Sequence, residues 1–264
     1  DYAAWTQLFE AYGKAFPELA AEWSRQLSGE LPDNLESILP VFDPAKKIAT
    51  RKASGETLQA LAKALPSLAG GSADLGPSNN TALKGLGSVG PDAYDGRNLH
   101  FGIREHAMGA IMNGMALHGG WMVYGATFLV FADYFKPAIR LAALMDIPVV
   151  YVLTHDSIFV GEDGPTHQPI EQLASLRSIP HMTVIRPADA AETALAWVSG
   201  LQNRKGPTAL ILRRQDLPML DRKECAPASG LMRGGYVLWQ NGEGLPELVL
   251  LATGSEVSIA LEAA

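Results

Sequence analysis

The stretch IPVVYVLTHDSIFVGEDGPTHQPIE, residues 147–171, joins an apolar run to a loop rich in titratable side chains. The run Ile147–Leu153 is typical of a strand buried in a parallel sheet. The loop that follows carries His155, His167 and several acids, among them Asp163. Ligands of open α/β sheets bind beyond the carboxyl ends of strands, so this loop is a candidate site for a polar ligand. The alternative is a solvated turn, which has no need of two histidines in so short a span.

Strand and helix patterns alternate on both sides of this stretch. Apolar runs of strand length recur at five places: Ser67–Ser72, Trp121–Ala126, Ile147–Thr154, Met182–Arg186 and Thr208–Arg213. Segments of helical period alternate with them: Thr50–Leu65, Arg104–His118, Phe128–Met145 and Asp189–Leu201. The alternation predicts a doubly wound α/β domain with a mainly parallel sheet.

The flanking segments divide the chain into four parts. Residues 1–47 are expected to form a helical linker, with one helix over Tyr2–Leu27 and a short helix before Pro40. The α/β domain covers 48–217, an irregular linker covers 218–235, and a second α/β domain begins at 236–264. The sequence lacks an initiator Met, and its last residues stop within a helical pattern. We therefore expect a piece of a longer chain.

Composition excludes several classes of protein. The 264 residues are 47% hydrophobic and 19% charged, as in a globular protein with a large core. A net charge of −7 disfavours nucleic acid and anionic membranes as partners. The single cysteine, Cys225, excludes an intrachain disulfide framework and fits a reducing cytoplasm. No apolar run approaches the length that spans a bilayer.

Two further patterns could belong to a site. Glu105 opens a nearly apolar helix, where the helix dipole alone favours a carboxylate; because that helix is expected to be buried, the carboxylate would be partly desolvated. Phe128, Phe131 and Tyr134 recur at helical spacing, which is more often typical of a core than of a cofactor pocket.

Other patterns are weaker. The turn GGSADLGPSNNT (70–81) fits neither a dinucleotide fingerprint nor a phosphate loop, and it is equally consistent with anion binding and with a surface turn. Three arginines, Arg51, Arg213 and Arg214, matter only if the fold brings them together. The loop histidines lack the spacing of a zinc site, and no GxSxG elbow of a hydrolase is present.

Five segments together resemble the transketolase family of thiamine diphosphate enzymes. They are GGSADLGPSNNT (70–81), FGIREHAMGAIMNGMALHGG (101–120), YGATFLVFADYFKPAIRLAALM (124–145), THDSIFVGEDGPTHQPIEQLASLR (154–177) and GPTALILRRQDLP (206–218). The resemblance covers most of residues 50–218 and implies the pyrimidine-binding domain of the family. It also implies that Mg or Ca and the diphosphate are bound by an amino-terminal domain, whose GDG…N motif is absent from this sequence.

The resemblance implies a role for each matching residue. Glu105 would hydrogen-bond the aminopyrimidine ring and promote loss of the thiazolium proton. The ring itself would lie in a pocket formed by Phe128, Phe131 and Tyr134. The sugar would be contacted by His155, Asp163 and His167. The catalytic residues would be these two histidines and Glu105. Phosphate would be bound by Arg51, Ser78 and Arg214.

The implied activity is transfer of a two-carbon ketol unit from a ketose phosphate to an aldose phosphate. The implied assembly is a homodimer, with the helix Arg104–His118 in the interface. Two alternatives remain at this point: a dihydroxyacetone synthase, or a non-catalytic half of a split enzyme. The isolated chain is expected to be inactive, because the diphosphate-binding motif is not in the sequence.

Overall fold

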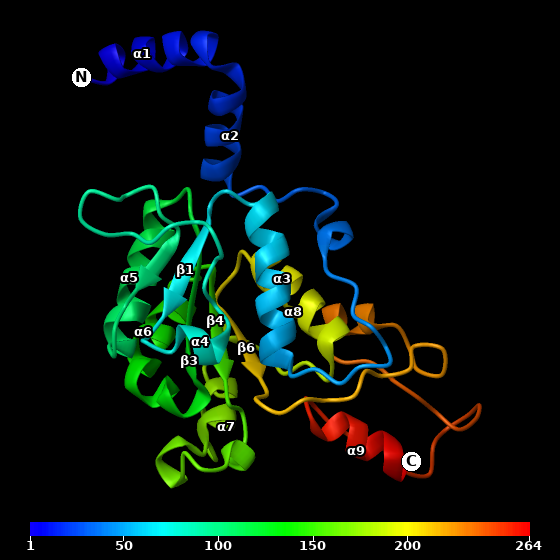
Figure 1. The fold of residues 1–264 in the computed structure, drawn as a ribbon. Coiled ribbons are helices and arrows are strands. Elements are labelled where there is room, and N and C mark those ends of the chain that lie inside the picture. Colours follow the sequence, from blue (N-terminus) through cyan, green and yellow to red (C-terminus); the bar gives the residue numbers. More distant parts are fainter.

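A six-stranded, fully parallel sheet forms the centre of the protein in a computed structural model that describes residues 1–264 (Figure 1). The strand order is β2-β1-β3-β4-β6-β5. The strand bounds are β1 Leu68–Ser72, β2 Asn98–His100, β3 Met122–Phe128, β4 Val149–Thr154, β5 Thr183–Ile185 and β6 Thr208–Leu212. The predicted doubly wound α/β domain is confirmed, because every pair of neighbouring strands is parallel and helices cover the sheet.

Helices connect the strands and extend the chain at both ends. The α-helices are α1 Tyr2–Ala15, α2 Pro17–Ser28, α3 Thr50–Ala64, α4 Gly76–Asn79, α5 Glu105–His118, α6 Ala132–Leu144, α7 Gln172–Arg177, α8 Ala190–Gln202 and α9 Glu256–Ala263. The 3-10 helices are η1 Leu35–Ile38, η2 Leu129–Phe131, η3 Ile158–Val160, η4 Pro165–His167 and η5 Ala228–Arg233. None of these helices combines the length and apolar character needed to cross a lipid bilayer.

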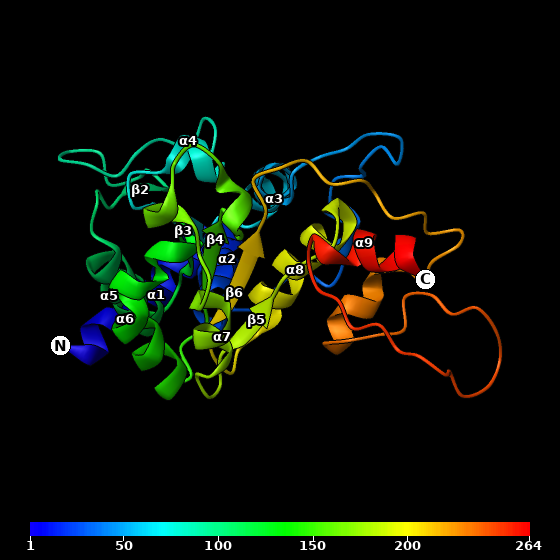
Figure 2. The ribbon, with the colours of Figure 1, turned by 90° about the horizontal axis from the view of Figure 1, so that it is seen from below.

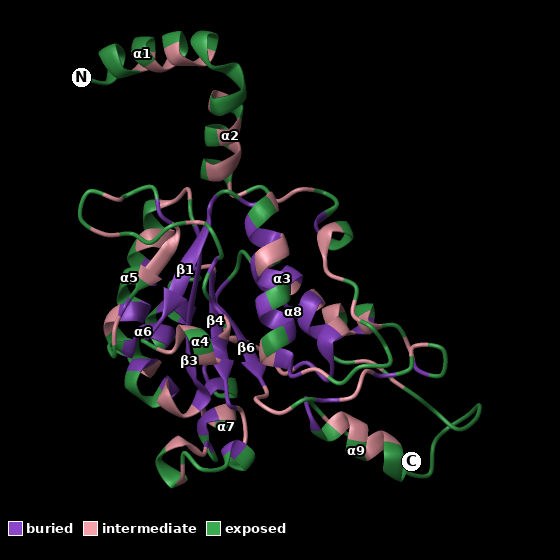
Figure 3. Ribbon diagram, in the orientation of Figure 1, coloured by how far each residue is buried: buried purple, intermediate pink, exposed green.

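The sheet separates two hydrophobic cores. Successive residues of a strand point to opposite faces, so Tyr151 and Leu153 enter the core under α5, α6 and α7, whereas Val152 enters the core under α3 and α8. Figure 2 shows the two groups of helices on opposite sides of the sheet, and Figure 3 shows their buried faces turned towards it. On the second face, the indole of Trp197 donates a hydrogen bond of 2.8 Å to Ser54 and so joins α8 to α3.

The structure corrects the predicted helix Phe128–Met145. Phe128 is extended (φ −73°, ψ 151°) and pairs with Thr154 as the last residue of β3, so the helix α6 begins only at Ala132. Strand pairing overrides the helical spacing of the aromatics at this point. Sequence reasoning also missed β2, a half-exposed strand of three residues, which is too short to show a periodic pattern.

The two ends of the chain lie outside the sheet. The predicted helix Tyr2–Leu27 is broken before Pro17 into α1 and α2, which project from the body as an arm without a buried residue (Figures 1 and 3). Gly29 ends α2 in a left-handed conformation, which a glycine adopts without steric cost. Residues 236–255, in the segment expected to begin a second α/β domain, contain no strand.

A pair of glycines in α5 provides a test of this packing. An added Cβ at Gly109 would lie 2.8 Å from the Cβ of Ala138 in α6, whereas one at Gly114 would meet nothing within 4 Å. We predict that Gly109→Ala lowers the free energy of unfolding by about 1–3 kcal/mol through overpacking. Gly114→Ala should raise it by about 0.5–1 kcal/mol through helix propensity. Urea unfolding of both variants measures this difference, and equal effects would contradict the close contact of α5 with α6.

Candidate active site at the carboxyl edge of the sheet

The carboxyl ends of the central strands meet at one edge of the sheet. The register pairs Ser72 of β1 with Ala126 of β3 and sets the end of β3, Phe128, beside Thr154 of β4. Thr154 in turn pairs with Leu212 of β6. The strand order reverses at β1, because β2 lies on one side of β1 and β3 on the other. In open α/β sheets, a ligand crevice forms at the carboxyl ends of the strands where the order reverses. This edge points away from the arm formed by α1 and α2 (Figure 1).

Glu105 opens α5 at this edge and is buried, with 7% of its surface exposed. Its carboxylate accepts one side-chain hydrogen bond, from the hydroxyl of Thr127 at 3.3 Å, and forms no ion pair. Buried carboxylates are normally paired or bonded several times. Glu105 therefore retains hydrogen-bonding capacity for a ligand.

Aromatic rings line the same edge. Phe128 stacks on the imidazole of His155 with the ring centres 3.7 Å apart. The ring of Phe131 lies nearly parallel to that of Phe128, with the ring centres 5.8 Å apart. His167 meets the ring of Phe131 edge-on at 5.2 Å. Tyr134 lies at the outer end of the group and is 67% exposed. The predicted aromatic set thus comes together, although its members belong to β3, η2 and α6 rather than to one helix.

A series of buried hydrogen bonds leads to the Nδ1 atom of His155. The amide nitrogen of Asn79 donates to Ser72 Oγ at 3.0 Å, and the hydroxyl of Thr154 donates to Asn79 Oδ1 at 2.6 Å. Thr154 Oγ1 also lies 2.8 Å from His155 Nδ1. All four residues are buried, and His155 has a left-handed backbone, with φ of 59°. The imidazole is therefore held by its backbone, its neighbour Thr154 and the stacked Phe128.

The surroundings of His155 favour its neutral form. Burial lowers the pKa of His155 to about 3, and the positive charges of Arg51 and Arg214, together with His167, act in the same direction. His155 is consequently an uncharged hydrogen-bonding group at neutral pH.

Two of the three predicted arginines lie together near His155. The guanidinium of Arg51 donates to the backbone carbonyl of Ser78 at 2.6 Å. Burial and the charge of Arg214 lower the pKa of Arg51, so the two cations are close enough to repel each other. Arg214 donates to the carbonyl of Val160 and forms an ion pair of 3.0 Å with the exposed Glu162. Such an arrangement of two cations favours an anionic ligand.

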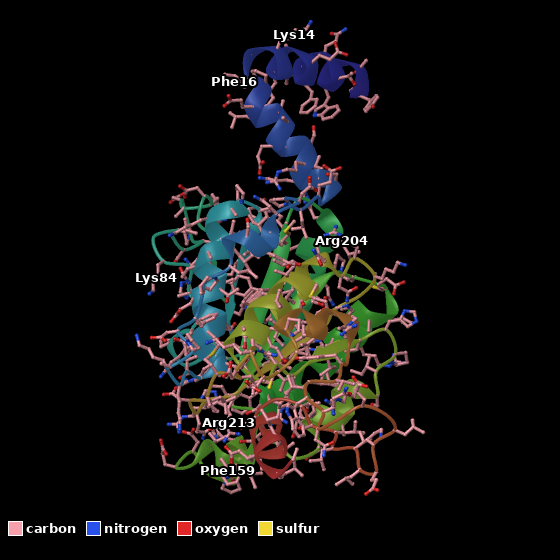
Figure 4. The ribbon with its side chains drawn as sticks, turned by 90° about the vertical axis from the view of Figure 1, so that its right-hand side faces the viewer. Lys14, Phe16, Lys84, Phe159, Arg204 and Arg213 are labelled. Atoms are coloured by element: carbon pink, nitrogen blue, oxygen red, sulfur yellow. The ribbon has the colours of Figure 1, made fainter.

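Arg213 does not join this group. Its side chain donates to Ser255 at 2.7 Å, next to the first residue of α9. Figure 4 shows Arg213 and Phe159 at the end of the molecule opposite the arm that carries Lys14 and Phe16.

The acids of the loop occupy different surroundings. Asp163 is exposed and has no side-chain hydrogen bond or ion pair, so the structure gives it no contact with the histidines. Asp156 is turned away from the loop and pairs with Arg186 at 2.7 Å, with 2% of its side chain exposed. No group of three or more His, Cys, Asp or Glu residues is arranged to hold a metal ion.

Sequence reasoning missed the polar residues beneath the site. Asn79 was assigned only to a turn, Thr154 only to the end of a strand, and Thr127 fell between a predicted strand and a predicted helix, yet each bonds a candidate site residue or its support. A signal was present in the sequence: Thr127 and Thr154 each lie at or next to the end of an apolar strand, where a hydroxyl reaches the ligand edge. Arg186, which fixes Asp156, gave no signal that distinguishes it from a surface arginine.

Comparisons with known proteins agree with this geometry. The family profile described as "Transketolase, pyrimidine binding domain" matches residues 46–219. The transketolase of Geobacillus stearothermophilus is 58% identical over 99% of this chain, and that of Bacillus subtilis is 51% identical over 98%. Each alignment covers 39% of the relative, so the chain spans about two fifths of the length of these curated relatives.

Solved structures give the same result. A Pichia stipitis transketolase in complex with sedoheptulose 7-phosphate superposes with a TM-score of 0.93 at 47% identity, covering 99% of this chain and 39% of that one. A split-gene transketolase, described as an inactive β4 tetramer, superposes with a TM-score of 0.54 at 30% identity, covering 66% of this chain and 54% of that one. With a family profile that matches most of the chain, and with both cores and the ligand edge in place, the chain belongs to the transketolase pyrimidine-binding domain family.

Proposed function

We propose that this chain supplies the pyrimidine-binding and sugar-binding half of a transketolase active site. The reaction is the reversible transfer of a two-carbon ketol unit from a ketose phosphate to an aldose phosphate. The observation that carries the proposal is the buried carboxylate of Glu105, with one hydrogen bond, at the same sheet edge as the aromatic rings of Phe128 and Phe131. The identity to transketolases along nearly the whole chain supports the same reaction.

The residues present fit the pyrimidine ring of thiamine diphosphate. A carboxylate that is buried yet bonded only to Thr127 suits a hydrogen bond to a ring nitrogen, and flat aromatic rings suit a flat heterocycle. When bound, the cofactor supplies the carbon nucleophile that carries the two-carbon unit. In this proposal Glu105 holds a proton between its carboxylate and the ring, and Phe128 and Phe131 orient the ring and exclude water.

Sugar phosphate recognition is assigned to the other side of the edge. Arg51 and Arg214 lie close together, and a phosphate would replace the weak, exposed pairing of Arg214 with Glu162. We assign the neutral His155 and the half-buried His167 to contacts with the sugar, because both lie at this edge. We assign Asp163 to the same sugar, on the basis of its place in the loop between the two histidines.

The diphosphate, a divalent metal and a second subunit belong to the proposal as well. We expect the ligands of Mg or Ca and the diphosphate to come from outside residues 1–264, since the family profile that matches this chain is that of the pyrimidine-binding domain. Exposed apolar side chains on α5, such as Ile111 and Leu117, support a homodimer through this helix. The single free cysteine, Cys225, supports a cytoplasmic location.

Replacing Glu105 by glutamine tests the proposed role. A chimera is made in which this chain replaces the matching residues of the G. stearothermophilus transketolase. Ketol transfer is then measured in this parent chimera and in its Glu105→Gln variant. We expect activity in the parent chimera and a loss of about 100- to 10,000-fold in kcat for the variant, because the amide cannot share the proton. Glu56→Gln, at an exposed position of α3, is the control and should change kcat little. An equal, small effect of both substitutions would refute the role of Glu105.

Isothermal titration of the 264-residue chain tests where the diphosphate binds. We predict a dissociation constant for thiamine diphosphate, with magnesium, of roughly millimolar or weaker, because ring burial and one hydrogen bond contribute only a few kcal/mol. The inactive β4 tetramer of a split-gene transketolase is consistent with this expectation. Micromolar binding would place diphosphate ligands within the chain.

The lowered pKa of His155 predicts a pH dependence of stability. An unfolded histidine takes up a proton near pH 6.5, whereas His155 in the folded protein does so only near pH 3. The unfolded state therefore binds more protons in between, and stability falls as pH decreases from about 6.5, by at most about 1.4 kcal/mol per pH unit from this residue. Urea unfolding at pH 7, 6 and 5 gives the free energy of unfolding as a function of pH. This free energy should change less with pH for His155→Gln than for the native chain. Identical slopes would mean that the pKa of His155 is not lowered by folding.

A further inference from the structure

Arg186 connects three parts of the chain at the carboxyl edge of the sheet. It follows β5 and reaches past the end of β6 to Asp156, which comes two residues after β4. Its Nε and Nη2 atoms lie 2.9 and 2.7 Å from Asp156 Oδ2. It also donates to the carboxylate of Glu256, to the hydroxyl of Ser255 at 3.3 Å and to the carbonyl of Thr253 at 3.0 Å. The guanidinium therefore joins Asp156 to the residues that open α9.

Asp156 depends on Arg186 alone. Its side chain is 2% exposed, and its second carboxylate oxygen, Oδ1, is buried without a hydrogen bond. A buried carboxylate is costly unless it is paired, and no other side chain pairs with this one. The position of Asp156 is therefore set by the position in which Arg186 is held.

The residues that open α9 hold Arg186 from another side. The Nε–Nη2 edge of the guanidinium faces Asp156, whereas its Nη1–Nη2 edge faces the carboxylate of Glu256. The backbone amide of Gly254 donates to the carbonyl of Arg186 at 3.0 Å. An added Cβ at Gly254, which has φ of 61°, would lie 2.7 Å from Arg186 Cγ, so this approach requires glycine. Asp156, Arg186 and Glu256 thus form a clamp between the end of β4 and α9.

The clamp acts on a residue with a constrained backbone. His155 lies between Thr154 and Asp156 and has φ of 59°. A residue other than glycine keeps this left-handed conformation where its surroundings hold it on both sides. Thr154 is paired in the sheet as the last residue of β4, and Asp156 is fixed by the clamp. These two anchors together fix the direction in which the imidazole of His155 points.

We infer that the clamp keeps the imidazole of His155 stacked on Phe128, so that the start of α9 contributes to the site from outside it. The members of the clamp are positioning residues, because they act on the site only through the backbone of His155. The benefit to sugar binding rests on the proposed function. The stacking is a property of the chain itself and does not depend on that function.

Proton NMR of the chain tests the inference without a ligand. The ring of Phe128 shifts the signals of the carbon-bound ring protons of His155 upfield, and the loss of these signals in His155→Gln assigns them among the six histidines. In Glu256→Ala, Arg186 loses one of its two carboxylates, so the His155 signals should move towards those of an exposed histidine. Glu262→Ala, at an exposed position of the same helix, is the control and should leave them in place. Unchanged signals in Glu256→Ala would overturn the inference.

A pair of glycines provides an independent test. Gly254→Ala places a Cβ against the side chain of Arg186, whereas a Cβ at Gly234, also left-handed with φ of 84°, meets nothing within 4 Å. Both alanines are strained, so a difference between the variants isolates the contact with Arg186. We expect the His155 signals to move in Gly254→Ala and not in Gly234→Ala; equal behaviour of the two would contradict the clamp. If thermal unfolding shows that Gly254→Ala has not folded, the half-exposed Glu256 still provides the deciding variant.

Kinetics of the chimera connect the clamp with the reaction. Loss of one hydrogen bond between His155 and the sugar should raise KM for the ketose phosphate by roughly 10-fold in Glu256→Ala. The dissociation constant for thiamine diphosphate should change little, because the clamp does not contact Glu105. Equal changes in both constants would show a general loss of structure and refute the positioning role. Moved NMR signals with an unchanged KM would instead support the clamp and remove His155 from sugar recognition, so the two failures are distinguishable.

Discussion

The parallel pairing of β3 with β4 is the constraint on which the candidate site depends. It sets Phe128 beside Thr154 at the ends of the two strands. His155, which follows Thr154, stacks on the ring of Phe128. Thr127, which precedes Phe128, donates a hydrogen bond to the carboxylate of Glu105. A shift of one residue in this register would turn these side chains to the other face of the sheet. One strand pair therefore joins the part of the edge assigned to the pyrimidine with the part assigned to the sugar.

The supports of the site come from segments that are distant in sequence. Asn79 lies 75 residues before Thr154 and bonds it in the interior. Arg186 pairs with Asp156 and also with Glu256 at the start of α9, so the segment after His155 is tied to the last helix of the chain. At the same end of that helix, Ser255 accepts a hydrogen bond from Arg213. The side chains of Arg186 and Asp156 are 9% and 2% exposed, so this pair anchors the start of the loop after β4 in the interior.

The sequence was informative where a residue's environment follows from its neighbours along the chain. The apolar run before His155 predicted a buried strand, which is β4, and the histidines of the loop after it lie beside aromatic rings at the carboxyl edge of the sheet. It was misleading where pairing overrides local spacing, as at Phe128, whose helical spacing to Phe131 concealed the end of a strand. It was silent on Asn79 and Arg186, because a hydrogen bond between segments far apart leaves no periodic trace. Recognition of the family motifs supplied the roles that periodicity alone left open.

In the proposed function, the pyrimidine ring of thiamine diphosphate binds against Phe128 and Phe131 with Glu105 as its hydrogen-bond partner. A crystal structure of the chimera with the cofactor bound tests it most directly. We predict a ring nitrogen within about 3 Å of a Glu105 carboxylate oxygen, a normal hydrogen-bond distance, with the ring against the two phenylalanines. A ring bound elsewhere, with Glu105 still bonded to Thr127 alone, would contradict the account.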